Sequence, residues 1–249
     1  MKLGLLLCFK ENSLDGRFCA EFIEKYVGFA PEKIILNSYV KDWNEKKHLK
    51  KIRECRNLED LIFISRTSSF MVTDVRSVKD PYQILDIAQD DHSFHPTDTE
   101  IETFINIDGF ICAYLFDSNY VTQQSARNQS KYEVAGIPLS LAEGIPFTID
   151  EHGHKVFDTS GNPGREDVIS STSLLASWKM WFGKNFYKIC PKEKLLNFDS
   201  AFSIKELPND VVYVQLYRDV EESRSQESQK TQACWRQWLD FDNLIKNNP

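Results

Sequence analysis

The chain has 249 residues, of which 41% are hydrophobic, 12% aromatic and 27% charged, a composition typical of a globular protein with a substantial core. Its formal net charge of −7 and the absence of a basic, aromatic-rich segment argue against nucleic-acid binding. No apolar stretch reaches the roughly 20 residues of a membrane span. Six widely spaced cysteines form no metal or redox motif, so we expect buried thiols in a reducing cytoplasm.

The first third of the chain predicts strands and helices in alternation. Phe18, Phe22 and Tyr26 recur at helical spacing between two short apolar runs, which indicates a helix between two strands. The expected elements are strands at residues 3–9 and 34–36, helices at 13–27 and 41–55, and a hairpin formed by 61–65 and 70–75.

The middle of the chain predicts further short elements. We expect helices at residues 81–88 and 98–107, the second capped by Thr97 or Thr99, with carboxylates in its first turn. Residues 110–116 form a continuous apolar run, which is typical of a strand buried on both faces. Asp117 follows this run and is expected to cap another helix.

The last third contains four of the five tryptophans. It predicts a hairpin of residues 145–149 and 155–157 that turns at Gly153, and a strand over 211–217. Two helices are expected, one over 174–182 and ending at Gly183, the other over 229–245. The fold class that follows is α+β, a single domain over residues 1–249 with a mixed β-sheet flanked by helices.

The negative charge is concentrated in one tract. From residue 80 to residue 126 there are nine carboxylates and no Lys or Arg, while the rest of the chain has 30 basic against 28 acidic residues (37 less 9). A surface of one sign attracts partners of the other sign and speeds their association. The tract therefore indicates a basic protein partner.

Two histidine groups are the candidates for a metal site. His92 and His95 lie beside Asp90 and Asp91, and His152 and His154 form a His-x-His pair across a predicted turn. Imidazole and carboxylate are ligands of zinc and iron, and a joint site would support metal-assisted hydrolysis. The simpler interpretation is that both groups are solvated loop residues, and no metal or other cofactor is predicted.

Catalytic and nucleotide-binding motifs are otherwise absent. The sequence has no Gly-x-Ser-x-Gly elbow, and the stretch from Gly161 to Gly164 has the spacing of neither a Walker loop nor a dinucleotide fingerprint.

A second feature is the turn-rich stretch from residue 156 to residue 165. Asp158 and Asn162 are suited to bonding their own backbone in successive turns, and Arg165 would lie beside them, able to pair with Asp158. Trp178 and Trp181 follow at helical spacing. These five residues are interpreted as a structural motif, a corner above an aromatic core.

Taken in order, several short motifs resemble the immunity protein 52 family of bacterial polymorphic toxin systems. The resemblance covers roughly residue 110 to the C-terminus. Its motifs are Ala-Tyr-Leu-Phe-Asp at 113–117, Gln-Gln-Ser at 123–125, Tyr-Glu at 132–133, Gly136, Asp-Thr-Ser-Gly-Asn-Pro-Gly-Arg at 158–165, and Trp-Lys-Met-Trp-Phe-Gly-Lys-Asn-Phe at 178–186.

The resemblance implies a cytoplasmic protein that binds and neutralises a toxin delivered by a competing bacterium, commonly by type VI secretion. Restriction-endonuclease-type nucleases are frequent partners in this family, and neutralisation requires no enzymatic activity. Because nucleases hold phosphates in a cationic groove, carboxylates suit the inhibitor, and the expected toxin-binding residues are Asp90, Asp91, Asp98, Glu100 and Glu102. Phe94 and Tyr82 are the proposed aromatic anchors. One alternative is a metal-dependent hydrolase or toxin-modifying enzyme that uses the four histidines, and another is an adaptor or scaffold with no toxin partner.

Overall fold

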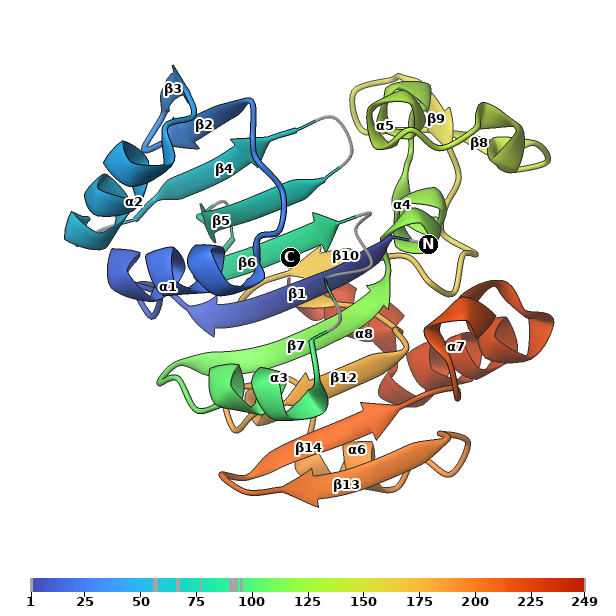
Figure 1. Ribbon diagram of the computed structural model, residues 1–249. Helices are drawn as coiled ribbons and strands as arrows, with labels where there is room; N and C mark the ends of the chain where they lie inside the picture. Colours follow the sequence, from blue (N-terminus) through green and yellow to red (C-terminus); the bar gives the residue numbers. More distant parts are fainter. Residues whose placement is uncertain are drawn as a thin grey trace.

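The computed structural model describes residues 2–248 except residues 56–57, 66–67, 77, 90–93 and 95. Its framework is a ten-stranded sheet with helices on both faces (Figure 1). In spatial order the strands are β13 (Ser203–Leu207), β14 (Val211–Gln215), β12 (Lys179–Phe182), β7 (Phe110–Asp117), β1 (Leu3–Lys10), β6 (Tyr82–Gln89), β5 (Ser69–Val75), β4 (Asp60–Ile64), β2 (Lys33–Leu36) and β3 (Tyr39–Asp42).

The two central strands, β1 and β7, are buried on both faces, as their continuous apolar runs predict. Successive side chains of a strand point to opposite faces. Leu5 and Leu7 of β1 therefore belong to one core cluster, whereas Leu6 and Cys8 belong to another on the far side of the sheet.

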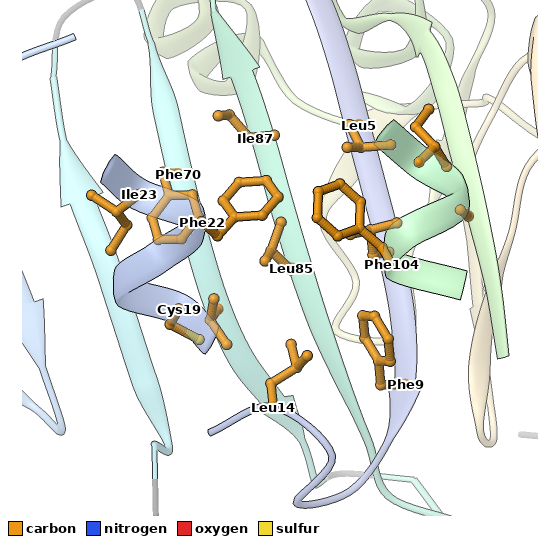
Figure 2. Close-up of a cluster of buried hydrophobic side chains, with 14 of the residues drawn as sticks. Leu5, Phe9, Leu14, Cys19, Phe22, Ile23, Phe70, Leu85, Ile87 and Phe104 are labelled. Carbon is orange, nitrogen blue, oxygen red and sulfur yellow. The ribbon is translucent and has the colours of Figure 1, made fainter. Parts of the chain in front are cut away.

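Three helices cover what we call the front face of the sheet, the face to which Leu5 and Leu7 point: α1 (Gly16–Tyr26), α2 (Glu45–Glu54) and α3 (Asp98–Ile105). Phe22 of α1 packs among the rings of Tyr26, Phe70 and Phe104, with centroids 4.9, 5.8 and 5.3 Å away. Figure 2 shows this cluster, in which apolar side chains from the helices lie directly on those of the strands.

The opposite face, here called the rear face, is covered by shorter segments. Those with residues in its core are α4 (Ser118–Ser125), the hairpin of β10 (Asp167–Ile169) and β11 (Thr172–Leu174), η2 (Phe186–Lys188), α6 (Lys192–Leu196), α7 (Gln226–Leu239) and α8 (Phe241–Asn247). A small lobe beside the sheet has its own core and consists of α5 (Gln129–Ala135), η1 (Leu139–Ala142), β8 (Phe147–Ile149) and β9 (Lys155–Phe157). One further turn, η3 (Val220–Arg224), follows β14.

The α+β class is confirmed, but the sheet is antiparallel rather than mixed at every junction between its described strands. The physical reason lies in the connections. β4, β5 and β6 form a meander in which each strand reverses the last, and β1 lies between β6 and β7 and runs opposite to both.

The helix predicted over residues 81–88 is wrong, because these residues form β6. Leu, Ala and Gln favour helices, and a short apolar run cannot by itself distinguish a helix from a buried strand. Pairing decides the outcome, since β6 hydrogen-bonds to β1 on one side and to β5 on the other. Tertiary pairing of this kind overrides local propensity.

The helix predicted over residues 174–182 is also wrong. The segment ends β11 at Leu174 and then forms β12, which pairs with β7 and β14. Trp181 packs in the front core, whereas Met180 and Phe182 pack in the rear core, so the side chains alternate as in a strand.

The predicted C-terminal helix over residues 229–245 is divided into α7 and α8. The break falls at Asp240, whose φ of 62° is left-handed and ends α7. In the described part of the chain, no helix combines the length and apolar character needed to cross a membrane.

Candidate functional site

The described carboxylates of the acidic tract do not gather on one surface. Asp98, Glu100 and Glu102 lie on α3, over the front face. Asp86 lies on β6 between Leu85 and Ile87, which point to the front core, so its own side chain is on the rear face. The sheet therefore separates charges that are neighbours in the sequence.

Helix α3 holds its carboxylates at the surface through a capping box, which confirms Thr97 as the N-cap. The Thr97 hydroxyl accepts a hydrogen bond from the Glu100 backbone N–H at 3.2 Å, and the Glu100 carboxylate accepts one from the Thr97 backbone N–H at 3.0 Å. That backbone hydrogen bond is the main reason that the pKa of Glu100 is lowered, so this side chain stays charged.

Two of the three α3 carboxylates are already paired with lysines. Asp98 contacts Lys179 at 2.7 Å, and Glu100 lies 3.5 Å from Lys25. For the half-buried Glu102, no side-chain hydrogen bond or ion pair is found among the described residues. Glu102 is therefore the α3 carboxylate most available to a partner.

Four of the predicted site residues, Asp90, Asp91, His92 and His95, lie outside the described residues.

The other histidine pair lies at the tip of the β8–β9 hairpin, which confirms the predicted turn, with Gly153 at a φ of 81°. His152 and His154 are exposed, and their backbone N–H groups donate to the carboxylate of Asp150 at 3.0 and 2.8 Å. In the described ranges no group of three or more His, Cys, Asp or Glu side chains could hold a metal ion. The hairpin tip therefore provides two imidazoles without the further ligands of a zinc site.

The proposed anchors are core residues. Phe94 is buried in the front core and Tyr82 in the rear core, so neither presents a ring to a partner. The sequence suggested them only because they lie close to the carboxylates of the tract.

The stretch 158–165 forms a tight corner, as predicted, but with different partners. Arg165 pairs with Asp167 at 3.1 Å and with Asp242 at 3.5 Å, rather than with Asp158. Asp158 instead accepts a hydrogen bond from the Ser160 backbone, a local turn that keeps the carboxylate away from the guanidinium.

This corner is fastened to α4. The Asn162 side chain donates to the backbone oxygen of Gln124 at 2.9 Å, and the Gly164 backbone donates to the Gln124 side chain at 3.2 Å. Gly164 lies so close to Tyr120 that an added Cβ would stand 2.5 Å from its ring. Glu166, two residues after Gly164, is also held against α4. Its backbone N–H donates a hydrogen bond to the Ser125 hydroxyl at 2.9 Å.

The two tryptophans have structural roles. Trp181 is fully buried 5.3 Å from the ring of Tyr213, and the half-buried Trp178 donates to the backbone oxygen of Arg218 at 3.3 Å.

A cavity of about 510 Å³ lies on the rear face, where β5, β6 and β1 meet α4 and α5. That volume is typical of small-ligand sites. Small side chains make room for it on the sheet, namely Ala88 of β6 and Ser69 of β5, which are paired neighbours. Apolar residues line one part of the wall, including Leu6, Ile84 and Phe116.

Two carboxylates with raised pKa values line this cavity. Burial and, to a lesser extent, the charge of Glu166 raise the pKa of Asp86 to about 7, against the opposing effect of Lys2. Burial also raises the pKa of Glu166, whereas a hydrogen bond from Ser173 favours its charged form. Carboxylates perturbed by burial in a cavity are more frequent at functional sites than elsewhere.

The sequence interpretation missed this pair. Asp86 was counted in the acidic tract but assigned to a helix, and Glu166 follows the turn motif without a pattern of its own. A usable signal was present, since Asp86 is the one charge inside the apolar run Tyr-Gln-Ile-Leu-Asp-Ile-Ala-Gln at 82–89. A charged residue inside a buried strand requires a specific environment.

Comparison with protein-family models, with curated proteins and with solved structures gave no match.

Proposed function

We propose that the chain is a cytoplasmic immunity protein that binds and neutralises a cognate antibacterial toxin by non-covalent occlusion. The proposal continues the motif resemblance described above. The structural observation that supports it is helix α3, whose first turns hold Asp98, Glu100 and Glu102 at the surface. A contact surface is all that occlusion requires, and the proposal assigns no catalytic step to this protein.

The partner that suits α3 is a basic protein such as a nuclease. A nuclease must bind phosphates with Lys and Arg, and the same groove attracts carboxylates. Charges at the rim of an interface mainly raise the association rate, and they lose this effect as salt screens them. We therefore expect α3 to set the speed of toxin capture rather than all of its affinity.

The first test asks whether a toxin gene lies immediately upstream of this gene, as the proposal predicts, and then uses the encoded toxin. That toxin is produced in bacteria with and without the immunity protein, and growth is measured together with binding of the two purified proteins. Protection with direct binding supports the proposal. Lack of binding to the neighbouring toxin, or turnover of a substrate by this chain, would contradict it.

The second test changes one charge on α3. Because Glu102 has no side-chain partner among the described residues, Glu102→Lys should leave the fold intact and slow association by about tenfold at low salt. Its matched control is Glu227→Lys, the same charge change on the exposed first turn of α7, behind the sheet. Equal association rates for the two variants across a salt series would show that α3 is not part of the toxin interface.

A triple variant extends the test to Asp90, Asp91 and Glu100, each changed to Lys. We expect slower association and a flatter salt dependence than in the unmodified protein. Since Glu100 also closes the capping box, the stability of this variant is measured alongside its binding rate.

A further inference from the structure

The rear-face cavity, which we call the Asp86 cavity, is lined by both apolar and polar residues. Its wall has an apolar part, with Leu6, Met71 and Val121 among its residues, and a polar part rich in hydroxyl groups. The hydroxyl residues are Ser65, Ser68, Ser69, Ser118, Thr122, Ser125 and Ser130. This combination suits a ligand with an apolar body and one hydrogen-bonding end.

The two carboxylates define the charge that such a ligand must have. Asp86 forms no hydrogen bond or ion pair with any of the described residues, and no lysine there contacts Glu166 within ion-pair distance. Lys2 and Lys131 also line the cavity and act on the carboxylates only at longer range. An uncompensated carboxylate in a partly enclosed site is costly, and a cation from outside removes that cost.

An organic cation fits better than a metal ion or an anion. Two carboxylates without a third protein ligand do not complete a metal site, and no larger ligand group exists among the described residues. The volume of about 510 Å³ exceeds that of a single ion many times over. An anion would be repelled by the charges of Asp86 and Glu166.

We propose that the Asp86 cavity binds a small primary amine, with its ammonium group between Asp86 and Glu166 and its apolar chain along Leu6, Ile84 and Phe116. The serine and threonine hydroxyls would accept the remaining ammonium hydrogens. The site is independent of the toxin-binding proposal, because it lies on the opposite face of the sheet from α3.

Protonation of Asp86 competes with this ligand. The charged groups that act on Asp86 are Glu166 from the segment before β10 and Lys2 at the start of β1, and Lys131 of α5 acts on Glu166. An ammonium ion requires the ionised carboxylate, so amine affinity should rise as the pH increases through about 7. Binding near that pH should release protons from the protein.

The experiment compares three probes of the same shape by isothermal titration calorimetry on the full chain. Hexylamine should bind at least about tenfold more tightly than hexanol, and hexanoate should not bind. Asp86→Asn and Glu166→Gln should each weaken hexylamine binding by about tenfold or more, whereas Glu143→Gln, an exposed carboxylate of the neighbouring lobe, should change it by less than about twofold. Thermal unfolding shows that each variant is folded.

Five results would overturn the proposal. The first four are no binding of hexylamine, equal binding of hexylamine and hexanol, preferred binding of hexanoate, and full hexylamine affinity in Asp86→Asn. Nα-acetyl-lysine amide, which keeps a free side-chain ammonium group, is included because a lysine side chain of a partner protein has the same chemistry. Tighter binding of that amide than of hexylamine would assign the cavity to a protein side chain and contradict a small-molecule ligand.

Discussion

The two faces of the sheet are covered in different ways. On the front face, aromatic rings of α1 and α3 pack on aliphatic and aromatic side chains of the strands, as Phe22 and Phe104 do in Figure 2. Phe22 contacts the rings of Tyr26, Phe70 and Phe104. On the rear face, polar groups enter the core. The Tyr114 hydroxyl donates to the backbone oxygen of Ser173 at 2.8 Å, deep in that core.

Buried polar groups occur in both layers, but they are bonded differently. On the front face, the buried side chains of Gln83 and Gln89 bond to backbone groups. On the rear face, buried side chains of the described residues also bond to one another. Cys8 and Cys112 lie opposite each other on β1 and β7, and the Cys112 thiol is 3.0 Å from the Thr172 hydroxyl. Beyond them lies the cavity with Asp86 and Glu166. Aromatic packing in the front layer stabilises the fold, whereas a layer with bonded side chains and a cavity provides an interior site. The comparison therefore assigns the main packing contribution to the front core and a small-ligand site to the rear, while the outer surface of α3 is the proposed toxin contact.

The largest effect is expected from the front face. Phe22→Ala should lower the free energy of unfolding by about 3–5 kcal/mol, because it removes a ring packed against three others and leaves a cavity. Phe22→Leu is the matched control and should cost less than about 1.5 kcal/mol if the neighbours repack. Urea unfolding measures both, and a loss below about 1 kcal/mol for the alanine variant would contradict the assignment of stability to this layer.

The next effect concerns Asp86 and its dependence on pH. The folded protein binds the Asp86 proton more tightly than the unfolded chain, so stability is largest below the unfolded pKa and decreases as the pH rises from about 4 to about 7. Asp86→Asn should abolish this loss and make the protein more stable at about pH 8, by at most about 4 kcal/mol for a shift of about three pKa units. Parallel stability profiles for the two proteins from acid to neutral pH would show that Asp86 is not buried in this way.

A smaller effect tests how the corner at 158–165 positions the rear face. Gly164→Ala should cost about 1–3 kcal/mol, because the added Cβ would meet the Tyr120 ring at 2.5 Å and force the corner away from α4. It should also weaken hexylamine binding by displacing Glu166. Gly161→Ala is the matched control in the same turn, since its added Cβ meets nothing within 4 Å. Similar stabilities for the two variants would mean that the corner tolerates movement.

Most elements could be predicted where local pattern and tertiary packing agree. α1 has apolar residues at helical spacing, which marks a helix with one buried face. β7 has an uninterrupted apolar run, which marks a strand buried on both faces. Thr97 and Asp117 were recognisable as caps because capping depends on residues within one turn.

The errors fall where pairing with distant strands decides the structure. β6 has helix-favouring residues such as Leu85 and Ala88. Trp178, which precedes β12, and Trp181 and Phe182 within β12 have a spacing that also suits a helix. Each segment becomes a strand because it fills a place between strands far away in the sequence, and no local pattern records that pairing. The misassigned β6 also concealed Asp86.

The sequence by itself determined the α+β class, the central buried strands, the helix caps and the concentration of carboxylates between residues 80 and 126, because each depends on neighbouring residues. Only the tertiary structure decided that the sheet divides those carboxylates, leaving Glu102 half-buried and unpaired among the described residues on one side and directing Asp86 into a cavity on the other. The reason is that alternation along β6 turns Asp86 to the rear face, whereas α3 packs on the front face. A charge pattern in the sequence becomes a surface only when the strands that carry it are placed.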